Sequence, residues 1–385
     1  MQKTEPKQQQ EKKVERIRWS KSGNKKGPVL VLFVGIHGNE PAGMYAVDRI
    51  AKRLSGDDEP INGTVYAVTG NIEAVKLGIR FLDTDLNRLW ERFNTSQDFS
   101  IRRAENRPAE YLESLEIKKT VDHIIDTHSG TSSDFVFIDL HTTSSQSCGF
   151  ILLNDTLENR DLAKGFPVPQ ILGIEENIQG TLLSYINNLG FKAIGFEAGA
   201  HNAEVSVIRS EAFLWLVLDK LGIYELSEEN RIRNRELLKT ENGVPATYYE
   251  IVHHKIVDDP QRFEMLDGFQ NFDQIEKDMP LAYEHGNLIK APRSGRIFMP
   301  LYQKVGNDGF LIVRKVSAFW LTLSGYLRKS FFHTLLKYLP GVTQVGEHSY
   351  EVNLNVARFL VKDIFHLLGY RVTQKDEDTL ICYRR

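Results

Sequence analysis

Apolar residues from Pro28 to Gly35 form a continuous run (PVLVLFVG) that ends in a glycine. Such a run is typical of a strand in a parallel sheet, because both faces of that strand are buried. Pro41 then fits the first turn of a helix. One face of this helix would carry the apolar residues Met44, Val47, Ile50, Ala51 and Leu54. The segment therefore predicts a buried strand, a polar turn and an amphipathic helix.

The same alternation continues to about residue 221. Further strands are predicted over 64–69 (TVYAVT), 135–140 (FVFIDL), 149–153 (GFILL) and 191–199 (FKAIGFEAG). Helices are predicted over 181–189 and 204–221. This alternation indicates an α/β fold over residues 16–235, with a mixed, mostly parallel sheet flanked by helices. Sites in such sheets lie at the carboxyl ends of the strands.

The rest of the chain changes character twice. A polar segment over 226–246 predicts a domain boundary. Short β-like segments separated by Gly, Pro, Asp and Asn then predict a small β-rich domain over 245–318. Residues 319–385 predict an α+β appendage, with a helix over 351–368 and a hairpin over 370–385. The charged, Gln-rich residues 1–15 predict a disordered lead-in.

Composition narrows the possible functions. The 385 residues exceed the usual size of one hydrophobic core, so two or more domains are expected. Lys and Arg number 48 against 51 Asp and Glu, which predicts neither a nucleic-acid partner nor a membrane surface. Two cysteines, no secretory signal and no apolar stretch of the ~20 residues needed for a membrane span favour a cytoplasmic location. The oligomeric state is not predicted.

Two candidate metal ligands, His37 and Glu40, stand in the polar turn after the first predicted strand. Catalytic zinc commonly binds two histidines and one carboxylate and keeps one position for water. His141 directly follows the strand over 135–140, so it would lie at the same edge of the sheet and could complete the set. The alternatives are a capping carboxylate beside a chance histidine, and a histidine satisfied within the core.

Two acidic residues lie close to these candidates in the predicted sheet. Asp139 stands two residues before His141, so both side chains project from the same strand face. It could orient a ligating imidazole, or it could be a helix cap or loop acceptor. Glu197 interrupts an apolar strand, where an ionised carboxylate is costly without a partner. It could accept a proton from zinc-activated water, or pair with a buried arginine.

Four motifs in this order carry a family resemblance: GIHGNEPAG, RFLDTDLNRLW, IDLHTT and GFEAG. Together they resemble the succinylglutamate desuccinylase/aspartoacylase family, within the zinc carboxypeptidase superfamily. The resemblance covers about residues 29–221 and extends more loosely to about 316. It implies a zinc carboxypeptidase-like fold with one zinc ion per chain, which would be held by His37, Glu40 and His141.

The resemblance also implies roles for other residues. Glu197 would be the general base and acid, Arg80 would polarise the scissile carbonyl, and Asn87 and Arg88 would grip the substrate carboxylate. Arginine suits both tasks, because its planar guanidinium binds carboxylates through two hydrogen bonds and stabilises oxyanion charge. Asp85 could orient Arg88 or cap the turn. A polar, Asx-rich loop with no role in binding is the alternative interpretation of DTDLNR.

The implied activity is zinc-dependent hydrolysis of the amide bond of an N-acyl amino acid or a similar small carboxylate-bearing amide. The alternatives are a zinc carboxypeptidase acting on short peptides, and an inactive zinc-bound scaffold that binds a partner. Residues 161–196 contain no arginine, whereas aspartoacylases have one there for the substrate. His201 follows GFEAG and could approach the substrate. Tyr302 is the nearest candidate for the family's late tyrosine.

Overall fold

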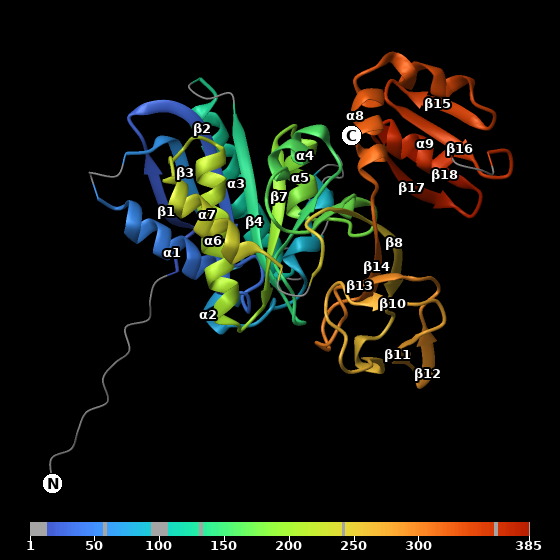
Figure 1. Ribbon diagram of the computed structural model, residues 1–385, viewed down its shortest axis with the longest axis horizontal. Helices are drawn as coiled ribbons and strands as arrows, with labels where there is room; N and C mark the ends of the chain where they lie inside the picture. Colours follow the sequence, from blue (N-terminus) through green and yellow to red (C-terminus); the bar gives the residue numbers. More distant parts are fainter. Residues whose placement is uncertain are drawn as a thin grey trace, which may run out of the picture.

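The computed structural model describes residues 14–56, 60–93, 107–130, 134–240, 243–357 and 361–384. Almost all of the predicted lead-in over 1–15 lies outside these ranges. Figure 1 shows an α/β part that is followed along the chain by a β-rich segment and a separate carboxyl-terminal lobe.

One mixed sheet of eleven strands runs through the first two of these parts, in the order β1-β3-β2-β4-β7-β5-β6-β8-β14-β13-β10. The strands of the α/β part are β1 (Ile17–Ser22), β2 (Lys25–Val34), β3 (Asn62–Thr69), β4 (Phe135–Thr143), β5 (Phe150–Leu153), β6 (Gln170–Leu172) and β7 (Lys192–Ala200). The pairs β3–β2, β2–β4, β4–β7 and β5–β6 are parallel, whereas β1 and β5 run antiparallel to β3 and β7. The predicted mixed, mostly parallel sheet is confirmed in this part.

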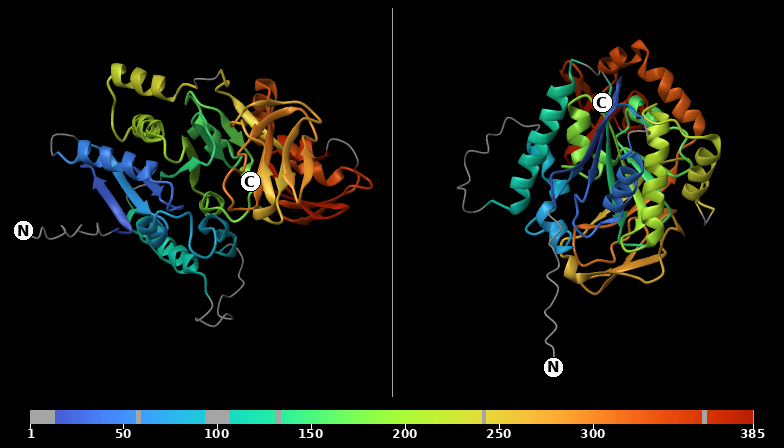
Figure 2. Two further views of the ribbon diagram at one scale, coloured as in Figure 1. Left: turned by 90° about the horizontal axis from the view of Figure 1, so that it is seen from below. Right: turned by 90° about the vertical axis from the view of Figure 1, so that its left-hand side faces the viewer.

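Helices cover both faces of the sheet (Figure 2). Strand β2 illustrates why both faces need a cover: its buried residues alternate between two hydrophobic cores, one on each face of the sheet. Leu30, Leu32 and Val34 belong to a core shared with α1 (Ala42–Leu54), α4 (Leu157–Ala163) and α6 (Glu204–Lys220). Val29, Val31 and Phe33 belong to a second core shared with α3 (Ala109–His128) and α5 (Leu182–Asn188).

Two segments without apolar periodicity contain helices. The polar segment over 226–246 includes α7 (Glu228–Leu238), which is capped by the Ser227 side chain and buries only Leu238. The polar and charged stretch over 91–119, which the sequence marks as a long insertion near the DTDLNR motif, contains the start of α3, and this helix continues to His128. His128 Nε2 lies 2.9 Å from the Tyr66 hydroxyl, while residues 94–106 are outside the described ranges. A third helix, α2 (Ile72–Leu77), precedes the loop with the DTDLNR motif.

The β-rich segment is continuous with the large sheet. Strand β8 (Tyr248–Ile256) pairs in parallel with β6, and β14 (Asp308–Lys315), β13 (Gly295–Phe298) and β10 (Gln274–Ile275) follow in antiparallel order. A small second sheet contains β9 (Phe263–Met265), β11 (Pro280–Glu284) and β12 (Asn287–Lys290). Strand β8 therefore joins the β-rich segment to the α/β part through its pairing with β6.

The carboxyl-terminal lobe has its own sheet, in the order β15-β16-β18-β17, and its own core. Its elements are α8 (Ala318–Arg328), the 3₁₀ helix η7 (Phe331–Tyr338), β15 (Val342–Gly346), β16 (Ser349–Asn353), α9 (Val361–Leu367), β17 (Tyr370–Asp376) and β18 (Thr379–Arg384). The predicted hairpin over 370–385 is confirmed as β17–β18. The helix predicted over 351–368 is wrong at its start, because Tyr350 and Val352 point into the core of the lobe from a strand paired with β18.

No described helix combines the length and apolar character that a membrane span requires.

Candidate metal centre

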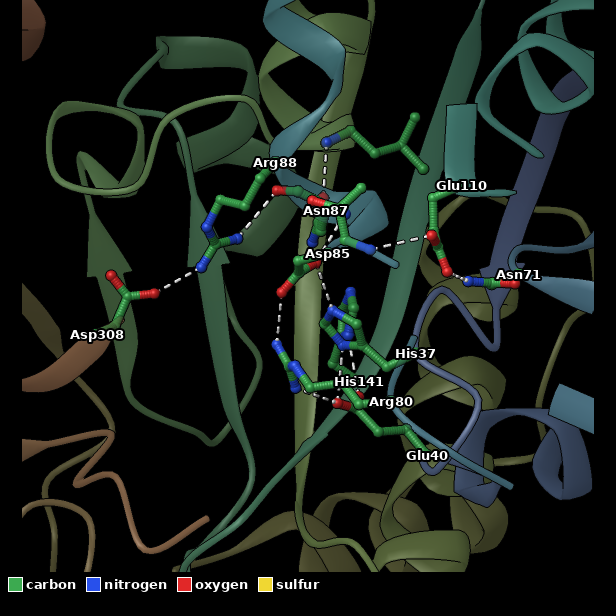
Figure 3. A network of polar contacts seen from close by, with 12 residues as sticks. His37, Glu40, Asn71, Arg80, Asp85, Asn87, Arg88, Glu110, His141 and Asp308 are labelled. Carbon is green, nitrogen blue, oxygen red and sulfur yellow. Dashed lines mark hydrogen bonds and ion pairs between the residues drawn. The ribbon is translucent and has the colours of Figure 1, made fainter. Parts of the chain in front are cut away.

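His37, Glu40 and His141 come together at the carboxyl edge of the sheet (Figure 3). The chain leaves β2 through Gly35, whose φ of 65° suits glycine, and the turn then presents His37 and Glu40 before α1 begins. His141 lies near the end of the neighbouring strand β4. All three side chains are buried, and one potential ligand atom from each lies within 4.8 Å of the other two.

Glu40 bridges the two histidines. Its Oε1 lies 2.8 Å from His37 Nδ1, and its Oε2 lies 3.0 Å from His141 Nδ1. Burial by itself would raise the pKa of Glu40, but the two imidazoles hold it well below its usual value. Two imidazoles and one carboxylate form the donor set of an open catalytic zinc site, so these residues fit that ion.

Asp139 lies where a residue that orients His141 would be. Its Oδ2 is 2.9 Å from His141 Nε2, on the far side of the ring from Glu40, although the angle does not make a hydrogen bond. Burial lowers the pKa of His141, but the neighbouring Asp139 and Glu40 carboxylates raise it well above its usual value. Nδ1 is the ring nitrogen of His141 that faces Glu40.

Glu197 stands beside His141, since the two residues are direct partners in the register of β4 and β7. It is buried, and its Oε2 makes no hydrogen bond to any residue that the structure describes. Burial raises the pKa of Glu197 to about 8; Glu40 and Asp139 act in the same direction, while His141 and Arg80 oppose them. A carboxyl group in this environment can exchange a proton near neutral pH.

Arg80 and Asp85 extend the centre from the loop after α2. Arg80 Nη1 lies 3.3 Å from Glu40 Oε1, and its Nη2 donates to Asp85 Oδ2 at 3.0 Å. Asp85 Oδ1 lies 3.0 Å from His37 Nε2 and also accepts the backbone N–H of Asn87 at 2.8 Å. Asp85 thus caps the short 3₁₀ helix η1 (Leu86–Arg88), and its side chain contacts Arg80 and His37, whereas Arg88 donates its backbone N–H to the Asp85 carbonyl.

Sequence reasoning missed Glu110, in the first turn of α3. Its buried carboxylate accepts hydrogen bonds from three backbone N–H groups and one side-chain amide: those of Leu82, Asp83 and Thr84, and Asn71 Nδ2. The loop that carries Arg80 and Asp85 is therefore held from α3. Only an acidic residue in the first turn of a helix signals this role in the sequence, and that signal is common at helix starts.

Asn87 and Arg88 lie on the other side of Asp85 (Figure 3). Asn87 Oδ1 accepts the backbone N–H of Leu182 at 2.8 Å and so joins η1 to the start of α5. Arg88 Nη1 donates to the Asn87 carbonyl at 2.9 Å, and its Nη2 donates to Asp308 Oδ2 at 2.6 Å. Asp308 comes from β14, and sequence reasoning did not identify it.

The two remaining candidate residues, His201 and Tyr302, lie in different surroundings. His201 lies beside the centre, with its Nδ1 2.8 Å from the hydroxyl of Thr142, the residue after His141. It also lines a cavity of about 870 Å³ together with Gly38 and Asn39. The Tyr302 hydroxyl instead donates to the Leu266 carbonyl and accepts the Phe269 N–H, so it fastens a loop of the β-rich segment.

Comparison with known proteins agrees with this geometry. Residues 26–211 match the family model of the succinylglutamate desuccinylase/aspartoacylase catalytic domain. The chain is 25% identical to succinylglutamate desuccinylase of Ectopseudomonas mendocina (strain ymp) over 324 residues, covering 77% of this chain and 89% of that protein. It is 30% identical to a probable aspartoacylase of Acaryochloris marina over 168 residues, covering 42% of this chain and 52% of the relative.

A solved structure shares the fold. The crystal structure of a succinylglutamate desuccinylase/aspartoacylase from Rhodobacter sphaeroides superposes with a TM-score of 0.54 at 16% identity, covering 76% of this chain and 87% of that chain. The matched residues contain the His37–Glu40–His141 group, which is typical of a zinc site in these proteins. The chain therefore belongs to the succinylglutamate desuccinylase/aspartoacylase family of zinc-dependent deacylases, which act on carbon–nitrogen bonds.

Proposed function

We propose that this chain hydrolyses the amide bond of an N-acyl amino acid, or of a similar small amide that bears a carboxylate. The observation that carries the proposal is the buried His37–Glu40–His141 group with Glu197 beside it, whose Oε2 has no hydrogen-bond partner among the described residues. A metal donor set and a group able to exchange protons are the two parts that metal-assisted amide hydrolysis needs.

His37, Glu40 and His141 would hold one zinc ion. When bound, zinc supplies Lewis-acid chemistry by lowering the pKa of a water molecule and polarising a carbonyl. Asp139, whose Oδ2 lies 2.9 Å from His141 Nε2, would help to orient the His141 ring with Nδ1 directed at Glu40. Because a cation in the centre would favour ionised carboxylates, it would oppose the effect of burial on Glu197 and help its carboxylate to act as a base.

Glu197 would take a proton from the attacking water and return it to the leaving nitrogen. Its position next to His141 in the sheet keeps this transfer within the centre. Arg80 would stabilise the negative charge that develops on the carbonyl oxygen of the substrate. Its contacts with Glu40 and Asp85 hold the guanidinium in place before substrate arrives, which limits the reorganisation needed in the transition state.

Asn87 and Arg88 would bind the substrate carboxylate. Arg88 has five N–H donors, of which two are used by the Asn87 carbonyl and by Asp308. The side chain of Asn87 uses its oxygen to hold Leu182, so its amide nitrogen remains the group that can donate to a ligand. Asn87 and Arg88, called the substrate clamp below, therefore use some of their hydrogen-bonding groups within the protein. Their remaining N–H donors would bind the substrate carboxylate.

A substrate panel tests the proposal. Zinc-loaded protein is assayed with N-acetyl and N-succinyl amino acids, and with dipeptides as the carboxypeptidase alternative. Hydrolysis of acyl amino acids that is abolished by chelation and restored by zinc supports the deacylase. Exclusive cleavage of dipeptides would reassign the protein to the carboxypeptidase alternative, and absence of any turnover by folded, zinc-loaded protein would favour the inactive scaffold.

A further inference from the structure

An ion pair joins the proposed substrate clamp to the β-rich segment (Figure 3). Asp308, the first residue of β14, accepts a hydrogen bond from Arg88 Nη2 at 2.6 Å through its Oδ2. Its Oδ1 lies 2.9 Å from Nε2 of His254, on the paired strand β8. The side chains of Arg88 and Asp308 remain 35% and 27% exposed, so both still face the solvent from which a substrate arrives.

Both arginines of the proposed site, Arg80 and Arg88, already form ion pairs with carboxylates of the protein. Arg80 contacts the carboxylates of Glu40 and Asp85, and Arg88 contacts that of Asp308. Residues 161–196 contain no arginine. The described part of the site therefore offers free N–H donors for one substrate carboxylate, but it offers no arginine without a carboxylate partner to a second one.

We propose that Asp308 is a specificity-determining residue, which holds Arg88 in place and directs the site toward amino acids with a single carboxylate. The proposal rests on the proposed function. A second carboxylate on the substrate, such as that of an aspartyl or glutamyl side chain, would approach the Asp308 carboxylate and be repelled. Like charges a few ångströms apart near a protein surface change affinity by about tenfold or more.

His254 keeps Asp308 in position from the opposite side. Because the imidazole binds Oδ1 while Arg88 binds Oδ2, the carboxylate stays anchored when a substrate takes some of the Arg88 donors. Asp308 therefore remains beside the clamp throughout binding and does not swing away to make room for a second anion.

The experiment compares substrates with the same acyl group and different amino acids: N-acetyl-leucine and N-acetyl-alanine with one carboxylate, and N-acetyl-aspartate and N-acetyl-glutamate with two. The wild-type enzyme should favour the monocarboxylates by at least about tenfold in kcat/KM. Asp308→Asn keeps an oxygen for Arg88 but removes the charge, so the ratio should shrink by about tenfold, mainly through a lower KM for the dicarboxylates. Asp308→Glu should retain the preference.

Glu250→Gln is the matched control. Glu250 pairs with Arg314 at 2.7 Å and so joins the same two strands, β8 and β14, at an exposed position. This variant should leave the ratio unchanged. Thermal unfolding of all variants shows whether the fold is intact.

Three outcomes overturn the role of Asp308 alone: a wild-type preference for dicarboxylates, an unchanged ratio in folded Asp308→Asn, or an equal loss on both kinds of substrate, which would mean that Asp308 only positions Arg88. Absence of hydrolysis both for this panel and for the corresponding N-succinyl amino acids overturns the proposed function.

Discussion

His141 and Glu197 lie directly opposite each other on the neighbouring parallel strands β4 and β7. His141 faces the bridging carboxylate of Glu40. Glu197 has one carboxyl oxygen, Oε2, without a hydrogen-bond partner among the described residues. The register of one strand pair thus places the proposed metal ligand and the proposed base side by side. A slip of one residue would turn one of the two side chains to the opposite face of the sheet.

The first prediction concerns metal content. Purified protein should contain about one zinc ion per chain, and His141→Ala should lose most of it, because only His37 and Glu40 would remain as ligands. Elemental analysis measures the occupancy. His123→Ala, on the exposed face of α3, is the control and should keep its zinc. Full occupancy in His141→Ala would show that His141 is not a ligand.

Zinc affinity should weaken as the pH falls. A histidine must lose its proton before it binds metal. The neighbouring carboxylates of Asp139 and Glu40 hold the pKa of His141 well above its usual value, so protons compete with zinc even near neutral pH. Competition with a chromogenic chelator between pH 6 and 8.5 measures the dissociation constant, which should rise steadily toward low pH. A constant affinity over this range would contradict the assignment.

Glu197→Gln should separate metal binding from chemistry. The variant should bind zinc almost normally, whereas kcat should fall by about 10²–10⁴, the usual contribution of general acid–base catalysis. Single-turnover assays at matched zinc occupancy make the comparison. Normal turnover with intact metal would instead assign Glu197 a structural role in the core.

If Asn87 and Arg88 bind the substrate carboxylate, kcat/KM should depend on the charge of that group. Converting the substrate carboxylate to an amide should lower kcat/KM by about tenfold to a few hundredfold, because hydrogen bonds to charged groups contribute roughly 1.5–3 kcal/mol each. Arg88→Ala should shrink this gap, whereas Arg80→Ala should slow acid and amide alike. An unchanged ratio in folded, zinc-loaded Arg88→Ala would contradict the clamp and leave Arg88 as the structural partner of Asp308.

Glu110→Gln should destabilise the fold in a pH-dependent way. Burial alone would raise the pKa of Glu110, but hydrogen bonds from the 82–84 backbone and Asn71 lower it below its usual value of 4.5. A carboxyl with a lowered pKa stabilises the fold above its unfolded pKa, and this contribution is lost as the pH falls through the folded pKa. Urea unfolding should give a difference of about 1–3 kcal/mol at pH 7 that narrows below pH 4.5.

Glu116→Gln provides the control on the same helix, because the Glu116 side chain forms an exposed pair with Lys119. Its unfolding free energy should match that of the wild type. Equal stability of Glu110→Gln and wild type at pH 7 would mean that the loop over 82–84 is held by other contacts. Activity of Glu110→Gln is expected to fall with stability, since the same loop positions Arg80 and Asp85.

The sequence by itself determined the α/β part of the fold and the place of the metal centre. The apolar run of β2 and the strand FVFIDL are buried on both faces. Burial on both faces requires apolar residues at consecutive positions, and the sequence shows such runs. Because parallel strands bring their carboxyl ends to one edge, His37, Glu40 and His141 could be placed together without coordinates. The family motifs supplied the proposed roles of Arg80, Asn87, Arg88 and Glu197.

Only the tertiary structure decided the contacts between distant segments. Glu110 and Asp308 stand in ordinary local sequence, and their partners lie up to 220 residues away. The helix predicted over 351–368 overlaps the end of β16, because the apolar residues there fit either period, and the pairing with β18 makes residues 351–353 a strand. Periodicity reports which face of an element is buried, whereas a polar contact depends on where two separate elements meet, and that position follows from the packing of the whole chain.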